Sequence, residues 1–168
     1  MTIIDSAFAH DLATTLAGGP QEVIALLNTQ FLALPGIRSV TWLATAPDFS
    51  VTHRIGTSDT QNFPIGGFDP IEKDNAWCMR IFGEKRPVIG NSVPEMAVFI
   101  PETDDLVAMG YGATMCAPII IGGAVRGTVN ILGDAGCLTP TVQDGVAVLL
   151  PLAALVFTYA GISDWPRA

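Results

Sequence analysis

The sequence predicts an α+β fold in which helical layers cover a central antiparallel sheet. Its clearest sign is the stretch 110–134, GYGATMCAPIIIGGAVRGTVNILGD, where two apolar segments fold back at Gly122-Gly123. Both faces of this expected hairpin are mostly apolar, as in a sheet covered on two sides. Helical patterns lie toward both ends of the chain, over 3–34 and after Pro140.

Two helices are expected before the first strand. Over 3–16, apolar residues recur at every fourth position, and Gly18-Gly19 ends this run. Pro20 suits the first turn of a second helix, whose apolar stripe over 23–34 ends at Pro35-Gly36.

A hairpin of two alternating strands follows, over 39–46 and 51–56, joined by Pro47-Asp48. In the first of these strands Val40, Trp42 and Ala44 should share one face. The next stretch, 57–69, is rich in turn-forming residues and is expected to be an irregular loop.

A helical segment over 76–82, capped by Asp74 or Asp69, should lead into a short strand at 87–90. Further along, Pro101 can open a helical turn that Gly110 ends in the left-handed conformation.

The final hairpin allows a prediction of register. A two-residue turn at Gly122-Gly123 places Cys116 opposite Val129 and Met115 opposite Asn130. One face would then hold Thr114, Cys116, Pro118, Ile120, Val125, Val129 and Ile131, and the other Met115, Ala117, Ile119, Arg126, Thr128 and Asn130. Thr139-Pro140 begins the last helix.

Size and charge narrow the possible functions. A chain of 168 residues is expected to be one domain, with an amino-terminal helix over 1–19, a core over 20–160 and a tail over 161–168. A net charge of −8, with no basic cluster beyond Lys85-Arg86, argues against nucleic acid as a partner. Three widely spaced cysteines and only two histidines predict a reducing compartment and neither a metal site nor another cofactor.

One apolar segment raises the question of a membrane. No charged residue lies between Asp144 and Asp164, but Pro151 interrupts this segment and neither flank is basic. We therefore expect a helix buried within the protein, with a dimer contact as further cover and no membrane partner. The amino terminus, MTIIDSAFAHD, resembles no secretory or transit signal, which predicts a cytoplasmic protein.

Four pieces of the chain, in this order, resemble a GAF domain across about 23–159. They are the opening helix that ends in Pro-Gly before the strand with Trp42, the segment AWCMRIFGEKRPVIGN, the hairpin APIIIGGAVRGTVNIL, and the apolar closing helix. The hairpin is the most specific piece, through Pro118, Gly122-Gly123 and Gly127. The resemblance implies a GAF/PAS-like sheet of five or six strands. It places the terminal helices on one face, often as a dimer bundle, and a helix- and loop-lined small-molecule pocket on the other.

Polar and aromatic residues near that implied pocket are the candidate ligand-binding residues: Trp77, Arg80, Asp104, Asp105, Tyr111, Thr114, Thr128 and Asn130. The amide of Asn130 lies in an otherwise apolar strand and needs partners, which a ligand or a neighbouring loop could supply. Asp104 and Asp105 could bind a cation or favour the positive end of a helix. The rings of Trp77 and Tyr111 could stack on a planar ligand or fill the core.

No catalytic arrangement is evident. Cys78 lies on the helix where the GAF enzyme free methionine-(R)-sulfoxide reductase carries a cysteine, but 101–114 lacks the essential one of that family. Cys116, inside a strand, is expected to be inert. The residue sets of cyclic-nucleotide and bilin-binding GAF domains are also not visible. We therefore expect a non-catalytic sensory or regulatory homodimer, joined through its terminal helices, that binds a small molecule. The alternatives are a thiol enzyme and a structural dimerisation module without a ligand.

Overall fold

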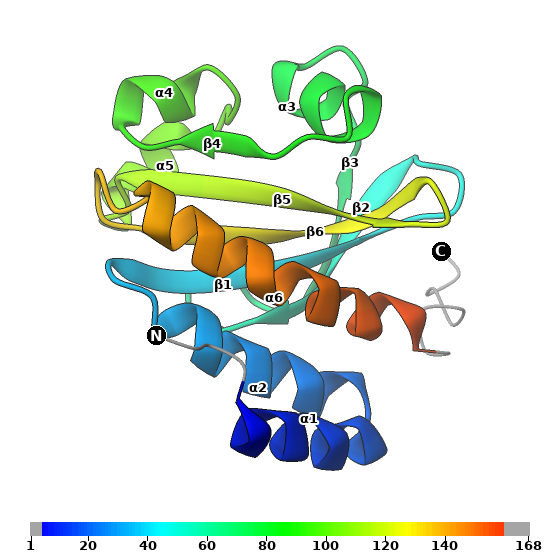
Figure 1. Cartoon of the computed structure of the whole chain (residues 1–168). Helices are drawn as coiled ribbons and strands as arrows, with labels where there is room; N and C mark the ends of the chain where they lie inside the picture. Colours follow the sequence, from blue (N-terminus) through cyan, green and yellow to red (C-terminus); the bar gives the residue numbers. More distant parts are fainter. Residues whose placement is uncertain (1–4, 160–168) are drawn as a thin grey trace.

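The protein folds around an antiparallel sheet, with helices on both of its faces (Figure 1). The structure is a computed structural model that describes residues 5–159. Within this range the sheet has six strands in the order β3-β2-β1-β6-β5-β4, so the predicted α+β class is confirmed. The strands are β1 Ile37–Thr45, β2 Val51–Thr57, β3 Gly66–Pro70, β4 Val88–Gly90, β5 Ala113–Ile121 and β6 Ala124–Gly133. The expected tail, 161–168, lies outside the described residues.

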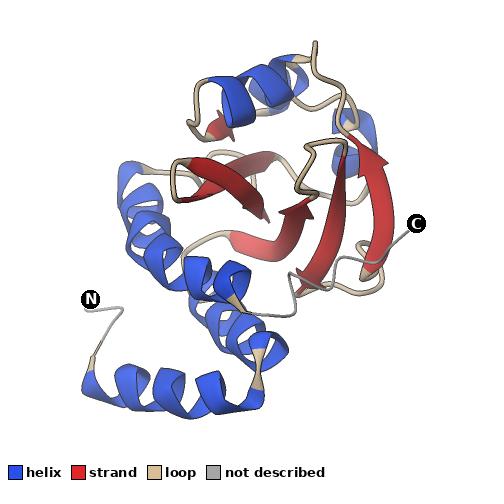
Figure 2. Ribbon diagram, turned by 90° about the vertical axis from the view of Figure 1, so that its right-hand side faces the viewer, coloured by secondary structure: helices blue, strands red, loops and turns tan. Residues whose placement is uncertain are grey.

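Long and short helices lie on opposite sides of this sheet. Seen from the side, the three long helices gather together, and α1 packs on α2 rather than on the sheet (Figure 2). They are α1 Ser6–Gly18, α2 Pro20–Leu32 and α6 Pro140–Thr158. The other side carries α3 Ala76–Cys78, the π-helical turn η1 Met79–Gly83, α4 Val93–Ala97 and α5 Thr103–Ala108.

The core between the sheet and the long helices is centred on Trp42. Its side chain is fully buried, and its ring lies edge-on to Phe31 and stacked on Phe157, with centroids 6.1 and 6.3 Å away. The indole Nε1 donates a 2.8 Å hydrogen bond to Oδ1 of the buried Asn28. Trp42 therefore joins β1, α2 and α6, as its place in an alternating strand predicts.

Helix ends follow the sequence signals with one correction. Thr139 caps α6, and Gly110, at φ 87°, follows α5 in the left-handed conformation, as predicted. The helix that begins at Ala76 is capped by Asn75, whose side chain accepts the Cys78 N–H, and not by Asp74 or Asp69. An asparagine immediately before the first turn can reach that N–H, whereas Asp69 belongs to a strand.

The prediction of an irregular loop over 57–69 is wrong at both ends of this range. Thr57 closes β2, and β3 begins at Gly66 and pairs with β2 along 66–70. The sequence does not indicate this strand, because Gly66, Gly67 and Pro70 are residue types typical of turns. Both glycines have positive φ. An edge strand tolerates proline, because one side of its backbone has no neighbouring strand to receive an N–H.

The last hairpin turns where predicted but pairs differently beyond its tip. Gly122-Gly123 both have positive φ, 60° and 78°, as a type I′ turn requires. A β-bulge then shifts the register between Ile119 and Ile120, because Arg126 is an extra residue in β6. Cys116 therefore lies opposite Asn130 instead of Val129, and the two share a face, contrary to the predicted register.

By length and composition alone, α6 could cross a membrane, with a mean hydropathy of 1.7 over its most apolar window. Val142, Val146, Leu149 and Ala153 are buried in the core shared with α2 and the sheet, so this side of α6 is a core face. The opposite side leaves Val148 46% exposed.

Candidate functional site

A cavity of about 500 Å³ lies on the sheet face opposite the long helices. Its size falls within the range of about 300–1,000 Å³ that is usual for small-molecule sites. The four central strands form its floor, and 63–77 together with 99–106 form its walls. The lining comprises Thr41, Leu43, Thr52, Arg54, Phe63, Asp69, Pro70, Ile71, Glu72, Asn75, Trp77, Phe99, Ile100, Pro101, Glu102, Leu106, Thr114, Cys116, Asn130 and Leu132.

An amide on β6 provides the principal polar group of the floor. The Nδ2 of Asn130 donates a 3.3 Å hydrogen bond to Oγ1 of Thr41 on the neighbouring strand. Its Oδ1 is buried and has no hydrogen-bond partner within residues 5–159. The protein therefore binds one of the two N–H donors of this amide, whereas the acceptor oxygen has no partner among the described residues.

Among the residues that the structure describes, Arg54 on β2 is the only cation in the lining. Its Nη1 donates to the Pro64 carbonyl at 3.3 Å, and its guanidinium carbon lies 5.6 Å from the ring centroid of Phe63. Its Nε is buried without a partner, and no carboxylate of the described chain lies within 4.0 Å to form an ion pair with it. Sequence reasoning missed Arg54, although its position in an alternating strand, beside Ile55 of the helix face, was a usable signal.

The mouth of the cavity is acidic. Asp69, Glu72 and Glu102 all line it and are all exposed. Sequence reasoning did not select these residues as ligand-binding, because Asp69 lies in the strand β3, which was not predicted, and nothing around Glu72 and Glu102 indicates a common location.

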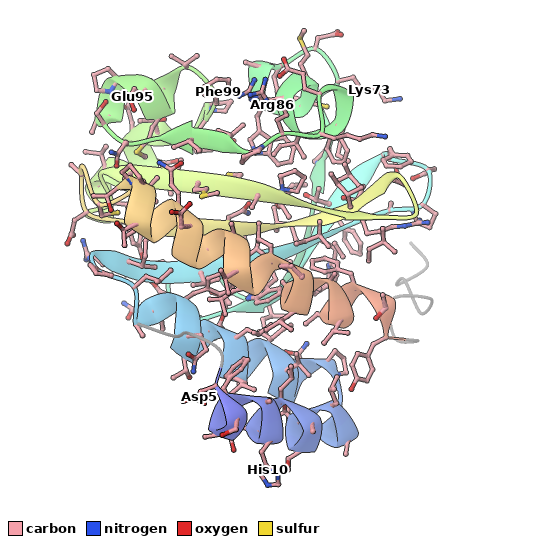
Figure 3. The ribbon with its side chains drawn as sticks, in the orientation of Figure 1. Asp5, His10, Lys73, Arg86, Glu95 and Phe99 are labelled. Atoms are coloured by element: carbon pink, nitrogen blue, oxygen red, sulfur yellow. The ribbon has the colours of Figure 1, made fainter. Side chains whose placement is uncertain are left out.

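Aromatic and aliphatic side chains make up most of the walls. Trp77 lies edge-on to Phe82, with their ring centroids 5.7 Å apart, and both of them, like Phe99, pack against a small buried apolar cluster. Phe99 belongs to the layer that holds α3 and α4 above the sheet (Figure 3). These rings offer flat apolar surfaces to a ligand.

Of the eight residues selected from the sequence, the structure brings Trp77, Thr114 and Asn130 together in the cavity lining. Thr128 is buried on the strand that carries Asn130, two positions away, and its hydroxyl has no described partner. It does not line the cavity.

The other four selected residues also lie outside the lining. Arg80 contacts the Pro87 carbonyl and pairs with Glu84 at 2.5 Å, which accounts for its charge. Asp104 and Asp105 are exposed in the first turn of α5, where carboxylates favour the positive end of the helix.

Tyr111 does not line the cavity but supports its wall. Its hydroxyl donates to Oδ2 of Asp59 at 3.1 Å, and its ring lies 6.0 Å from that of Phe63. The guanidinium of Arg38 also lies over the Tyr111 ring, 5.2 Å from its centroid. A hydrogen bond from Asn62 lowers the pKa of Asp59, and burial raises the pKa of Tyr111. Tyr111 therefore holds the loop that carries Phe63.

The cysteines are poor nucleophiles. Burial raises the pKa of Cys116, which lines the cavity, to about 11. Burial also raises the pKa of Cys78, which does not line the cavity, and of Cys137. At neutral pH all three are therefore protonated thiols. No group of three His, Cys, Asp or Glu side chains in the described part of the chain could hold a metal ion.

No protein-family model and no curated protein matches the sequence. Solved structures match the fold. The GAF domain of an Acinetobacter phosphoenolpyruvate-protein phosphotransferase aligns with a TM-score of 0.67 at 8% identity, over 95% of this chain and 98% of that one. The GAF domain of a two-component sensor histidine kinase from Bacillus halodurans gives 0.64 at 13% identity, over 86% and 97%.

A third similar structure is the chromophore-binding domain of a bacteriophytochrome from R. palustris. It aligns with a TM-score of 0.65 at 12% identity, over 93% of this chain but 59% of that one. At such identities the likeness concerns the fold, whereas the residues of the cavity have to be interpreted for themselves.

Proposed function

We propose that this chain, which has the fold of a GAF domain, is a sensory or regulatory domain that binds a small molecule in the cavity above its sheet. The supporting observation is a cavity of about 500 Å³ that contains two buried polar atoms without a described partner, Oδ1 of Asn130 and Nε of Arg54. Such an atom typically costs about 1–3 kcal/mol of stability, which a ligand with complementary groups would recover.

The solved structures with this fold support the regulatory part of the proposal. They include a domain from a two-component sensor histidine kinase, which is a sensory protein by its name, and the chromophore-binding domain of a bacteriophytochrome. This support is an analogy of fold, and the chemistry of the cavity supplies the independent argument.

The protonated state of the cysteine thiols favours binding without catalysis. A thiol enzyme needs a thiolate that reaches its substrate, whereas burial keeps Cys116 protonated in the cavity lining. Under the thiol-enzyme alternative, iodoacetamide at neutral pH would modify Cys116 rapidly and abolish ligand binding. We expect slow modification.

Homodimerisation through the terminal helices is the second part of the proposal. The outward side of α6 exposes Ala147, Val148 and Pro151, and α1 exposes Ala9 and Ala13. These side chains are apolar and small, so two such surfaces can approach closely. Three free cysteines are consistent with a cytoplasmic location.

A thermal-shift screen against a library of metabolites tests the binding proposal, because a ligand raises the melting temperature by mass action. Leu106→Trp should fill the cavity and remove the shift caused by any hit. Val107→Trp is the matched control, because Val107 is the next residue on α5 and is 40% exposed outside the lining. A screen without any stabilising compound would favour the structural-module alternative.

Light scattering coupled to size-exclusion chromatography tests the dimer. Val148→Glu should convert the dimer to a monomer, because it places a charge in the proposed apolar contact. Val107→Glu, on the opposite side of the sheet, should leave the mass unchanged. A wild-type chain that elutes as a monomer at all concentrations would contradict the dimer and leave the binding proposal intact.

A further inference from the structure

We infer that the ligand is a planar aromatic molecule that carries one carboxylate and one N–H donor, held between Arg54 and Asn130. This inference rests on the proposed function, since it assumes that the cavity binds a small molecule. It follows from the two polar atoms without a partner, from the ring-lined walls and from the distribution of charge.

The guanidinium of Arg54 favours an anionic group on the ligand. A guanidinium stays protonated at all physiological pH values, and it binds a carboxylate best through two parallel N–H donors. Within residues 5–159, its one hydrogen bond to the protein goes to the neutral Pro64 carbonyl, and its buried Nε remains a donor without an acceptor. A ligand carboxylate would supply both the charge and the acceptor.

The side-chain oxygen of Asn130 favours a hydrogen-bond donor on the ligand. Its Nδ2 already donates to Thr41, whereas its buried Oδ1 has no partner among the described residues and is the group we assign to the ligand. An amide oxygen accepts hydrogen bonds and cannot donate them. The part of the ligand above β6 must therefore present an N–H or O–H group.

The position of the two residues in the sheet indicates the shape of the ligand. Their strands, β2 and β6, lie on either side of β1, two inter-strand spacings or about 10 Å apart. The rings of Trp77, Phe99 and Phe63 line the same cavity. A flat aromatic body can span this distance and stack on such rings.

The acidic mouth limits the charge of the ligand. Asp69, Glu72 and Glu102 line the cavity together with Arg54, the one cation among the described lining residues. A multiply charged phosphate would meet three carboxylates and one counter-charge, which disfavours nucleotides. A single carboxylate can be matched by the single guanidinium.

Calorimetric titration of the full chain with five probes tests the inference. Indole-3-propionate has the inferred groups. Its 1-methyl derivative lacks the N–H donor, indole-3-propionamide lacks the charge, tryptamine reverses the charge, and adenosine 5′-monophosphate adds a phosphate. We expect indole-3-propionate to bind most tightly and the amide to bind about ten- to hundredfold more weakly, as for loss of a charged hydrogen bond.

Variants connect each preference to its residue. Arg54→Met should abolish the preference for the carboxylate over the amide, and Arg54→Lys should retain part of it. Asn130→Leu should abolish the preference for indole-3-propionate over its 1-methyl derivative. Arg126→Met is the control, because Arg126 is exposed on the same sheet and does not line the cavity. Circular dichroism establishes that each variant is folded.

The outcomes separate this inference from the proposed function. If tryptamine or adenosine 5′-monophosphate binds as tightly as indole-3-propionate, or if the carboxylate preference survives in Arg54→Met, the ligand class is wrong and small-molecule binding stands. If neither these probes nor any metabolite in the thermal-shift screen stabilises the chain, both proposals fail.

Discussion

The two faces of the sheet bury their residues in different ways. On the face toward α2 and α6, the buried side chains are almost all apolar, and the one indole N–H, that of Trp42, is paired with Asn28. On the other face, short helices and loops enclose a cavity, and Arg54 and Asn130 keep buried atoms without a described partner.

This contrast indicates a division of labour within one sheet. A closely packed apolar face supplies stability, because apolar burial is the dominant favourable term in folding. The cavity face carries unsatisfied polar atoms that reduce stability unless a ligand binds. The domain can maintain the second face because the first one holds the strands in place.

The largest expected effect is a loss of stability that differs between the tryptophans of the two faces, Trp42 and Trp77. Trp42→Ala should destabilise the protein by about 3–5 kcal/mol, because it removes a fully buried ring and leaves Asn28 without its donor. Trp77→Ala, at a half-buried position in the cavity lining, should cost clearly less. Urea denaturation measures both. Equal losses would mean that the two faces contribute equally to stability.

A second prediction concerns the close approach of β6 to its neighbours. A Cβ at Gly127 would lie 2.1 Å from the Leu43 carbonyl oxygen and 2.4 Å from the Phe157 ring. Gly127→Ala should therefore cost about 3 kcal/mol, at the upper end of the usual range for overpacking. Gly83→Ala is the control, since a Cβ there meets nothing within 4 Å. The same denaturation assay distinguishes them, and similar stabilities would contradict the close packing of β6 against β1 and α6.

A third prediction uses pH to examine the cavity face. Burial raises the pKa of Cys116 from 9.0 to about 11, so the folded state holds this proton more tightly than the unfolded state. Its contribution is fully present below pH 9 and is lost as the pH rises toward 11. The loss should amount to roughly 2–3 kcal/mol. Comparison with Cys116→Ala separates the contribution of the Cys116 thiol from that of other titrating groups. If the free energies of unfolding of the two proteins change in parallel between pH 8 and 11, this prediction is wrong.

The smallest expected effect has opposite signs at two buried threonines of the last hairpin, Thr128 on β6 and Thr114 on β5. Thr128→Val removes a buried hydroxyl that has no described partner, so stability should stay unchanged or rise by up to about 1 kcal/mol. Thr114→Val removes a hydroxyl that donates to the Ile131 carbonyl at 3.3 Å, and should cost about 1 kcal/mol. Thermal denaturation detects the difference. A loss at Thr128 would show that its hydroxyl is satisfied, for example by water.

The helix-covered face was predictable because its signals are periodic. The alternation around Trp42 and the helical spacing over 23–34 each specify one buried side without knowledge of the rest of the fold. Thr139-Pro140 and Gly110 likewise mark helix ends through local chemistry alone.

The cavity face was predictable only in part. Of the residues selected from the sequence, Trp77, Thr114 and Asn130 line it, whereas Arg54 and the acidic residues of the lining were not selected. These acidic residues come from the edge strand β3 and from irregular stretches, and their contacts depend on tertiary structure. Strand β3 and the bulge at Arg126 were also missed, because a one-residue change in pairing has no periodic signature.

The bulge in β6 has a consequence for how such a domain can diversify. The extra residue, Arg126, sits near the exposed hairpin tip, yet it decides which β6 side chains lie level with Cys116 over the cavity. A single-codon insertion or deletion at this tip could therefore exchange the groups offered to a ligand while every cavity residue keeps its identity.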